Sequence, residues 1–407
     1  MSKTVWIINQ YASTPSTGMG GRHYYLAREL AKKGHDVYVI GESNHHLLRR
    51  PPKFSGLFEV EPLDGFKFVW VKMPSYSDAH SRKRVLNWLL FPWKIRKLSS
   101  VIRSVPDVVI CSSPSPIAFL GAQSLAKKFG AKLVFEVRDI WPLTLTEIGG
   151  FSELHPFIRF MQWVEDKAYR DSDCVISNLK NSVDHMVARG LDARKFSWVA
   201  NGFSLAEVHN KEPLEESVIA AIPRGKFIVG YTGTIGVANA LDSLVCAAKL
   251  LKDYDGIHFV IVGDGKERER LVADVVRKGL DNVSFIPSIP KAQIQSMLSL
   301  FSVCYIGLTR DPLFRFGVSP NKLFDYLYSG KPVLYAIDSG KYRPIDECGA
   351  GLQVEPENPE NLAEAVLHLY HKGEEDRLEM GRNGRAAALN EYEYGVLAAK
   401  LESAIFS

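Results

Sequence analysis

The sequence predicts an α/β protein built from two doubly wound parallel sheets, one in each half of the chain. In both halves, short apolar runs typical of buried parallel strands alternate with amphipathic stretches of helical period. The chain has 407 residues, more than one hydrophobic core usually supports. We therefore expect two Rossmann-like domains, residues 1–203 and 224–390, joined by a polar, acidic linker at 204–223.

The first domain begins with the apolar run TVWIINQ (4–10), followed by a loop rich in Ser, Thr and Gly and an amphipathic helix that Gly34 ends. Its further strands are expected at 36–41, 67–72, 107–111, 132–137, 173–177 and 196–203. In the second domain we expect strands at 226–233, 257–265, 283–286, 303–308 and 333–337, and helices at 239–252, 266–279, 290–300 and 320–329. Parallel sheets of this kind bind ligands outside the carboxyl ends of their strands. We therefore expect the two domains to face each other across a ligand-binding cleft.

Residues 315–332 (RFGVSPNKLFDYLYSGKP) predict a complete short helix with a signal at each end. Ser319 is a good N-cap because its hydroxyl accepts from unpaired amides of the first turn, and Pro320 suits the first helical position. Gly330 stands where a left-handed residue ends a helix. The amide-rich start of such a helix attracts anions.

Two charged side chains of this helix predict a sugar-nucleotide site. Lys322 lies in the first turn, and Asp325, three residues later, leaves the same face. We expect Lys322, with Arg315 just before the helix, to bind phosphate groups, and Asp325 to accept hydrogen bonds from ribose hydroxyls. The alternative is a solvent-exposed helix on which Lys322 and Asp325 form an ordinary ion pair.

Charge and composition exclude several classes of protein. The net charge of +4 is too small to indicate nucleic-acid binding. No apolar run is long enough to cross a bilayer and the N-terminus has no signal-peptide pattern, so we expect a soluble or peripheral protein in the cytoplasm. The five cysteines lack the spacing of metal ligands, and two D-x-D strings, 171–173 and 253–255, are expected to be loop carboxylates. We expect neither a metal ion nor a cofactor.

Several motifs follow one another in matching order: Gly20-Gly21 before LARELAKKGHDVYVI, then VRDIWP (137–142), NGF (201–203), GYTGTIG (230–236), VGDG (262–265), SPNKLFDYLYSGKPVL (319–334) and MGRNGR (380–385). With them the chain resembles, nearly end to end, the retaining glycosyltransferases of family 4, which have the GT-B fold. Within that family it is similar to bacterial surface-polysaccharide transferases that include N-acetylfucosamine transferases. The resemblance implies that residues 391–407 return as a helix to the first domain.

The resemblance also implies the reaction. A sugar is transferred from a nucleotide-sugar donor to an acceptor hydroxyl, and the anomeric configuration is kept. The donor is expected to be UDP-linked, with an N-acetylated hexosamine such as N-acetylfucosamine, and to lie on the second domain. A lipid-linked saccharide acceptor is expected on the first domain, in the synthesis of a surface polysaccharide such as a lipopolysaccharide O-antigen or a capsule.

The donor-binding residues that the resemblance assigns depart in part from the family pattern. Asp325 stands at the second acidic position of the family's E-x7-E signature, but the first falls on Gly317. The diphosphate-binding Arg and Lys of the family fall on Thr234 and Asn239. Cations and backbone amides near the predicted helix are the expected replacements. The expected donor-binding residues are Arg315, Gly317, Val318, Asn321, Lys322, Asp325, Thr234, Gly236, Gly263 and Ile286.

Two glycines and a charged pair are the residues of the first domain expected at the reacting centre. Gly20 and Gly21 allow the backbone to approach a donor phosphate or the acceptor closely; the alternative is a plain loop before a helix. Arg138 and Asp139 stand where many family members carry a His-Asp or His-Glu pair. We expect Arg138 to stabilise charge on the leaving group and Asp139 to accept from a sugar hydroxyl, the alternative being a structural ion pair. Gly21, Arg138 and Asp139 are thus expected in catalysis.

Residues 79–106 combine seven basic residues and no acidic residue with a run of Trp, Leu and Phe. Such a segment is typical of a helix lying on an anionic bilayer, where each basic residue contributes about 1 kcal/mol. Pro92 is expected to divide it into two short helices, and the alternative is a buried helix with solvated basic residues. The residues expected at the acceptor or at the inner face of the plasma membrane are Gly20, Arg82, Lys83, Arg84, Trp88, Trp93 and Lys94.

Three other functions fit parts of the sequence less well. A nicotinamide dehydrogenase needs G-x-G-x-x-G directly after the first strand, and His23 stands where the third glycine belongs. A non-hydrolysing UDP-sugar 2-epimerase shares the architecture but needs an acid–base cluster that the sequence does not offer. A catalytically inactive GT-B scaffold subunit is the non-enzyme alternative, because expected acidic and basic residues of the family are missing.

Overall fold

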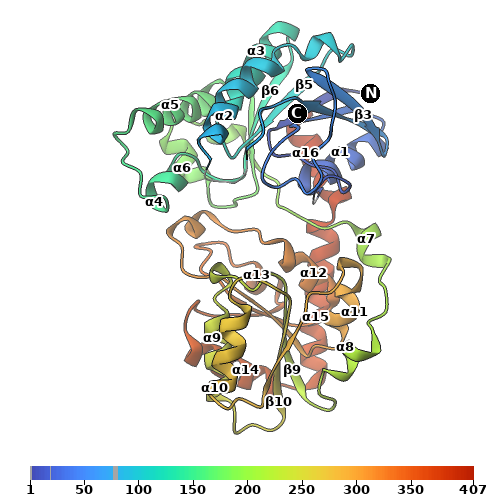
Figure 1. The fold of residues 1–407 in the computed structure, drawn as a ribbon, viewed down its shortest axis with the longest axis vertical. Coiled ribbons are helices and arrows are strands. Elements are labelled where there is room, and N and C mark those ends of the chain that lie inside the picture. Colours follow the sequence, from blue (N-terminus) through green and yellow to red (C-terminus); the bar gives the residue numbers. More distant parts are fainter. Residues whose placement is uncertain (1, 19, 77–80) are drawn as a thin grey trace. The chain divides into compact units, whose positions relative to one another are not determined.

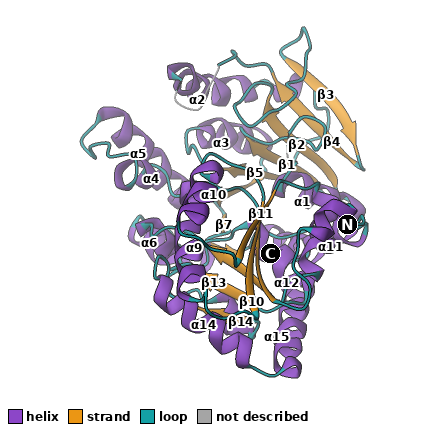
Figure 2. Cartoon of the chain, turned by 60° about the horizontal axis from the view of Figure 1, so that its bottom comes forward, coloured by secondary structure: helices purple, strands orange, loops and turns teal. Residues whose placement is uncertain are grey.

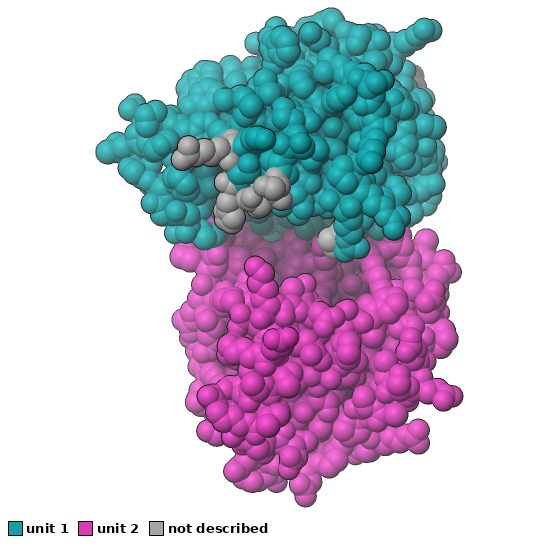
Figure 3. Space-filling view, viewed as in Figure 1, with its two compact units in different colours: residues 1–201, 394–407 teal, residues 202–393 magenta. Residues whose placement is uncertain are grey.

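The chain folds into two compact units (Figure 3). The computed structural model describes residues 2–18, 20–76 and 81–407, except for the side chain of Arg82. The first unit comprises Met1–Asn201 and Tyr394–Ser407, and the second comprises Gly202–Glu393. Each unit contains one sheet accompanied by helices (Figures 1 and 2), and this confirms the predicted fold class of two Rossmann-like domains.

The sheet of the first unit has eight strands in the order β3-β4-β2-β1-β5-β6-β7-β8. Neighbouring strands are parallel except for the edge pair β3 and β4. The central strands are almost continuously apolar and buried, because helices cover both faces of a parallel sheet. The strands are β1 (Thr4–Asn9), β2 (Asp36–Glu42), β3 (Phe58–Leu63), β4 (Phe66–Val71), β5 (Val108–Ser112), β6 (Lys132–Val137), β7 (Cys174–Ser177) and β8 (Phe196–Trp198).

Strand β3 departs from the apolar pattern and was not predicted. It includes two glutamates and Pro62, and most of its residues are partly or fully exposed. A proline is tolerated there because one side of an edge strand needs no backbone donors. The pairing of Phe58 with Val71 begins an antiparallel hairpin that extends the sheet beyond β4.

The helices of the first unit include the last one of the chain. Tyr394, at the start of α16, stacks on Tyr25 of α1 with 4.7 Å between the ring centroids, and Lys33 donates to Glu402 at 2.6 Å. The final helix therefore belongs to the first unit and begins at Tyr394. The helices are α1 (Arg22–Lys32), α2 (Arg82–Ile95), α3 (Ala118–Phe129), α4 (Leu143–Glu147), α5 (Pro156–Asp171), α6 (Val183–Ala188) and α16 (Tyr394–Phe406), with 3-10 turns at Leu98–Ser100 and Ala193–Lys195.

Helix α2 runs without interruption through Pro92, so the prediction of two short helices was wrong. Phe91 and Ile95 are fully buried on either side of the proline. Their packing stabilises the last turn against the loss of one backbone hydrogen bond, since tertiary contacts outweigh local propensity in most protein helices.

The sheet of the second unit has six strands in the order β11-β10-β9-β12-β13-β14, all parallel. The strands are β9 (Phe227–Thr232), β10 (Ile257–Val262), β11 (Val283–Ile286), β12 (Val303–Gly307), β13 (Val333–Ala336) and β14 (Gly351–Gln353). The helices are α7 (Leu205–His209), α8 (Glu216–Ala220), α9 (Leu241–Leu250), α10 (Arg268–Arg277), α11 (Ile294–Ser299), α12 (Asn321–Ser329), α13 (Pro344–Cys348), α14 (Pro359–His371) and α15 (Glu374–Ala387). Shorter turns are 3-10 segments at Val237–Asn239, Lys291–Gln293 and Pro312–Phe316 and a π segment at Ala388–Tyr392.

The segment 204–223, expected to be a linker, belongs to the second unit and carries α7 and α8. The amide of Glu212 donates to the carbonyl of Ala292 at 2.9 Å, and the side chain of Glu207 pairs with Lys291 at 2.6 Å. Two of the acidic residues that indicated a linker, Glu207 and Glu212, therefore bind the 3-10 segment Lys291–Gln293, which precedes α11.

Candidate functional site

Helix α12 carries the side chains around which the candidate site in the second unit is built. It begins at Asn321, with Pro320 before it at ψ 132° and no side-chain cap, so Ser319 is not the N-cap that was predicted. The extended conformation of Pro320 places the first helical residue one position later than expected. Gly330 ends the helix with φ 72°, in the predicted left-handed conformation.

Lys322 extends from the first turn of α12 to the loop that follows β9. Its Nζ donates to the hydroxyl of Tyr231 at 2.7 Å and to Oδ1 of Asn239 at 2.9 Å, and it lies 4.3 Å from the centre of the Tyr231 ring. Burial lowers the pKa of Lys322 to about 8. In the described part of the chain the ammonium has no ion pair with a carboxylate, so the alternative of a Lys322–Asp325 pair is not realised.

Asp325 lies one turn further along α12 and is partly buried. Burial raises the pKa of its carboxyl group to about 6; the charge of Lys291 lowers that pKa and the charge of Glu207 raises it. Its backbone carbonyl accepts from Gln295 at 3.1 Å. A carboxylate in this setting gains from a ligand that offers hydroxyl donors, because desolvation without hydrogen bonds is costly.

Glycines after β9 and β10 let two loops pack backbone against backbone. Gly233, Gly263 and Gly265 have φ values of 137°, 144° and 158°. A Cβ at Gly263 would overlap the carbonyl oxygen of Gly233, and one at Gly265 would overlap that of Ile235. The amides of these loops are mostly in use: Ile235 donates to the carbonyl of Asp264 at 2.9 Å, so this amide of the predicted Thr234–Gly236 turn is not open to a ligand.

A cavity of about 240 Å³ lies beside these loops. This is smaller than the roughly 300–1,000 Å³ of pockets for drug-sized ligands, so it suits a single ring system. Ile286, expected here, has its side chain buried in the sheet, and its carbonyl accepts from the Gly263 amide at 2.9 Å. The cavity is lined by Gly233, Thr234, Val262, Gly263, Asp264, Ser288, Ile289 and Ile294.

The residues just before α12 are less suited to binding than expected. The exposed Arg315 donates to the carbonyl of Pro312 at 2.5 Å and lies 4.4 Å from the centre of the Phe316 ring. Gly317, at φ 93°, donates its amide to the carbonyl of Phe314 at 2.8 Å. The structure therefore brings Lys322 to the β9 loop but engages Arg315 and the Gly317 amide within their own turn. The side chains of Val318 and Asn321 make no hydrogen bond or ion pair with the part of the chain that the structure describes.

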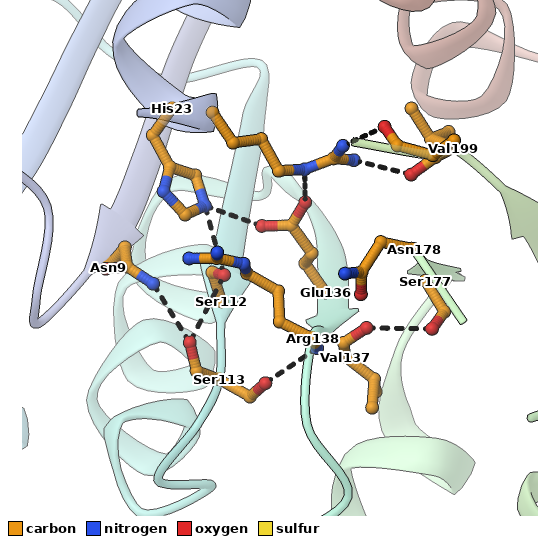
Figure 4. A network of polar contacts seen from close by, with 12 residues as sticks. Asn9, His23, Ser112, Ser113, Glu136, Val137, Arg138, Ser177, Asn178 and Val199 are labelled. Carbon is orange, nitrogen blue, oxygen red and sulfur yellow. Dashed lines mark hydrogen bonds and ion pairs between the residues drawn. The ribbon is translucent and has the colours of Figure 1, made fainter. Parts of the chain in front are cut away.

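A buried charged network occupies the carboxyl ends of β5 and β6 in the first unit (Figure 4). Glu136 accepts from Nε of Arg22 at 2.8 Å and lies 2.7 Å from Nε2 of His23, which is also 3.1 Å from Oγ of Ser112. Burial acts to raise the pKa of Glu136, but the charges of Arg22 and His23 hold it well below its usual value. Arg22 also donates to the carbonyls of Val199 and Ala200, which anchors the start of α1.

The sequence reading missed this network, although it contained a signal. Glu136 is a lone acid in the apolar run KLVFEV, and a fully buried charge in such a strand requires a partner. The partners Arg22 and His23 follow Gly21, which at φ 90° precedes α1. Gly20, at φ 69°, is left-handed as well, so both glycines have a conformational role at this helix start.

Arg138 and Asp139 follow β6 directly. The Arg138 amide donates to Oγ of Ser113 at 2.8 Å, and its side chain extends toward the His23–Glu136 pair (Figure 4). Its charge lowers the pKa of both partners, and its Nε is buried without a hydrogen-bond partner in the described residues. The Asp139 side chain is exposed.

Helix α2 separates its residues into two faces. Trp88 is buried, with Nε1 2.6 Å from the Tyr11 hydroxyl, so it does not reach a membrane as expected. Arg84 lies on the same face, 5.1 Å from the centre of the Trp88 ring. Lys94 donates to the carbonyl of Lys72 at 2.5 Å. The opposite face presents Leu86, Leu89 and Trp93, which are 47%, 47% and 56% exposed. Lys83 at the start of α2 and Lys97 just after its end are exposed as well.

Arg82 was also expected at the acceptor or the membrane. Its side chain lies outside the described residues, so this role stays a prediction. No helix among the described residues is long and apolar enough to cross a membrane. Within those residues, no three His, Cys, Asp or Glu side chains gather where they would hold a metal ion.

Comparison with known proteins identifies the two units. Residues 17–202 match the family described as Glycosyl transferase 4-like domain, and residues 214–387 match Glycosyl transferases group 1. The chain is a glycosyltransferase. The enzyme is 23% identical over 361 residues to the putative colanic acid biosynthesis glycosyl transferase WcaI of Escherichia coli strain K12, covering 86% of this chain and 88% of that protein.

Solved structures show that the glycosyltransferase has the GT-B fold. It is similar to trehalose-6-phosphate from E. coli bound with UDP-2-fluoro glucose, at a TM-score of 0.74 and 10% identity over 99% of this chain and 98% of that chain. It is also similar to sucrose-phosphate synthase of Thermosynechococcus elongatus, at 0.70 and 15% over 98% of each chain. A third is HepE of Anabaena in complex with UDP and glucose, at 0.63 and 14% over 98% of each.

Proposed function

We propose that this glycosyltransferase moves a sugar from a UDP-linked donor to a lipid-linked saccharide acceptor in the synthesis of a bacterial surface polysaccharide, an O-antigen or a capsule. The donor sugar is an N-acetylated hexosamine such as N-acetylfucosamine, and its anomeric configuration is retained. The observation that carries the proposal is the Lys322 ammonium held against the glycine turn after β9, beside a cavity of about 240 Å³.

The second unit supplies the donor site. The cavity takes the nucleobase, Asp325 accepts from the ribose hydroxyls, and Lys322 neutralises the diphosphate. During transfer the bond between the anomeric carbon and the diphosphate oxygen breaks, and the acceptor oxygen bonds to the same face of that carbon. The acceptor proton leaves with the diphosphate. A cation beside the departing diphosphate stabilises the charge that develops on it.

The first unit supplies the acceptor site and the contact with the cytoplasmic face of the membrane. The exposed apolar face of α2, flanked by lysines, has the character of an interfacial helix. Arg138, whose Nε has no hydrogen-bond partner within the described residues, is the residue proposed to contact the leaving group, and Asp139 the residue proposed to contact the sugar. The comparisons support the choice of substrates, because WcaI is named for colanic acid biosynthesis and two of the structural relatives are described with UDP or a UDP-sugar.

Ligand binding and turnover test the proposal. Thermal shift and calorimetry with UDP, GDP, ADP and UDP-N-acetylhexosamines should show stabilisation by uridine ligands, which reaches about 2.7 kcal/mol at 100 times Kd. Lys322→Ala and Asp325→Ala should remove the shift, and Lys252→Ala, at an exposed position near the end of α9, should keep it.

Turnover then separates the alternatives. Incubation with a UDP-sugar and a lipid-linked saccharide should release UDP and form an anomerically retained product. Binding without release of UDP under any acceptor would identify a scaffold subunit, and conversion of the UDP-sugar to its 2-epimer would identify an epimerase. The absence of binding to UDP would overturn the proposal.

A further inference from the structure

The hydrogen bonds of Lys322 leave part of its ammonium group uncommitted. An ammonium has three donors, and the described residues use two of them, through the Tyr231 hydroxyl at 2.7 Å and Asn239 Oδ1 at 2.9 Å. A Cβ placed on Gly233 would lie 3.1 Å from Nζ. The group is therefore fixed in position next to Gly233, which carries no side chain, with one N–H left.

Both acceptors are themselves fixed. The Tyr231 hydroxyl donates its proton to the carbonyl of Thr234 at 2.6 Å, so its lone pairs are turned to Lys322. Asn239 is the last residue of the 3-10 turn Val237–Asn239, and its backbone N–H donates to the carbonyl of Gly236 at 3.0 Å. A lysine side chain has four flexible bonds, and two neutral acceptors, one in β9 and one in the 3-10 turn after it, determine where its charge lies.

The charge itself lacks compensation. Both acceptors are neutral, since burial also raises the pKa of Tyr231 above its usual value. In the described residues no carboxylate pairs with Lys322, and burial alone accounts for its lowered pKa. A partly buried cation that is held in place by neutral groups is destabilised until an anion arrives.

We propose that Asn239 and Tyr231 are positioning residues that hold the Lys322 ammonium against the Gly233–Gly236 turn, with its remaining N–H directed at the diphosphate of the donor. This inference rests on the function proposed above. It places the diphosphate-binding charge on α12, supported by Tyr231 of β9 and by Asn239 of the turn that follows. Asn239 then acts through Lys322 and does not bind phosphate.

This geometry predicts the result of exchanging the residues at positions 322 and 239 by mutation. Because Asn239 and Lys322 are joined by one hydrogen bond, a lysine at 239 brings its ammonium to the same place, and an asparagine at 322 restores the acceptor. The double variant K322N/N239K should therefore regain the UDP affinity that K322N alone loses. A purely structural role for either residue gives no such rescue.

Calorimetric titration with UDP and with uridine tests the inference. K322N should lower the affinity for UDP at least about tenfold and leave the affinity for uridine unchanged. N239A and Y231F should lower the affinity for UDP about three- to tenfold. The double variant should return to within about threefold of the original protein, and K252A serves as the control. Each variant is first shown to keep its melting temperature within a few degrees.

The pH profile separates positioning from packing. Without Asn239 or the Tyr231 hydroxyl the ammonium loses an acceptor, so the pH above which UDP affinity falls should move below that of the original protein. Unchanged UDP affinity and pH profile in N239A and Y231F, or a double variant no better than K322N, would overturn the inference while the proposed function stands. Absence of UDP binding by the original protein would overturn both.

Discussion

Replacing Asp325 by Asn should stabilise the second unit and weaken donor binding at the same time. Burial raises the pKa of this carboxyl group from 3.8 to about 6, which corresponds to at most about 3 kcal/mol of destabilisation at pH 7.5. The side chain is only partly buried, so solvent screening reduces the expected gain to about 1–2 kcal/mol. For a unit of this size the melting temperature should rise by roughly 2–4 °C per kcal/mol.

The sign of the pH dependence is fixed by the direction of the pKa. Because the folded-state pKa of Asp325 is raised, its protonated form contributes stability that is present below about pH 4 and lost as the pH rises through about 6. The advantage of D325N over the original protein should therefore be full at pH 7.5 and shrink toward pH 4. Donor affinity at pH 7.5 should fall, since an amide oxygen is a weaker acceptor than a carboxylate.

Differential scanning calorimetry at pH 7.5 and pH 5 measures the effect. All seven tryptophans lie in the first unit, so tryptophan fluorescence reports that unit separately and should not change. Asp281→Asn, at an exposed position in the same unit, is the matched control. A D325N variant that is no more stable than the original protein at pH 7.5, or whose gain is equal at pH 5, would refute the reasoning.

Three further predictions concern other parts of the chain. UDP affinity should fall about tenfold per pH unit above pH 8, because the pKa of free Lys322 is about 8 and the diphosphate favours its charged form; calorimetry in buffers of different ionisation enthalpy should detect the proton uptake, and a flat profile would contradict this. Glu136→Gln should cost about 3–5 kcal/mol in urea denaturation, since Arg22 stays buried without its counter-charge, with the exposed Glu153→Gln as an unaffected control. Serine at the three exposed apolar positions of α2 should abolish flotation with anionic vesicles, whereas serine at two exposed apolar positions of the second unit should not, and unchanged flotation would exclude α2 as the contact. The α2 positions are Leu86, Leu89 and Trp93, and the control positions are Leu250 and Val276.

The sequence allowed most of the strands to be predicted because these strands are covered on both faces. Besides β3, the three-residue strand β14 was not predicted. A strand such as β10, buried at every position, leaves an uninterrupted apolar run. The sequence of β3 contains no such apolar run, because this strand lies at the sheet edge and carries charged residues and a proline. The failure at β3 therefore has the same physical cause as the success elsewhere.

The charged residues of α12 could be predicted, but not their partners. Lys322 and Asp325 follow from local spacing, whereas Tyr231 and Asn239 reach Lys322 only through the tertiary fold. Trp88 was misplaced for another reason: the basic segment was interpreted by composition, while its helical period sets residues 84, 88, 91 and 95 on one face. That face packs inward.

The contact between the loops after β9 and β10 limits how this enzyme can change its ligand preference. Gly263, which lines the cavity, leaves no room for even one methyl group beside the carbonyl of Gly233, so a side chain cannot be introduced at this position of the cavity wall. Diversification must act through the lining residues that carry side chains, which include Thr234, Asp264, Ser288, Ile289 and Ile294. A library confined to these five codons would vary the lining of the cavity without disturbing the contact between Gly233 and Gly263.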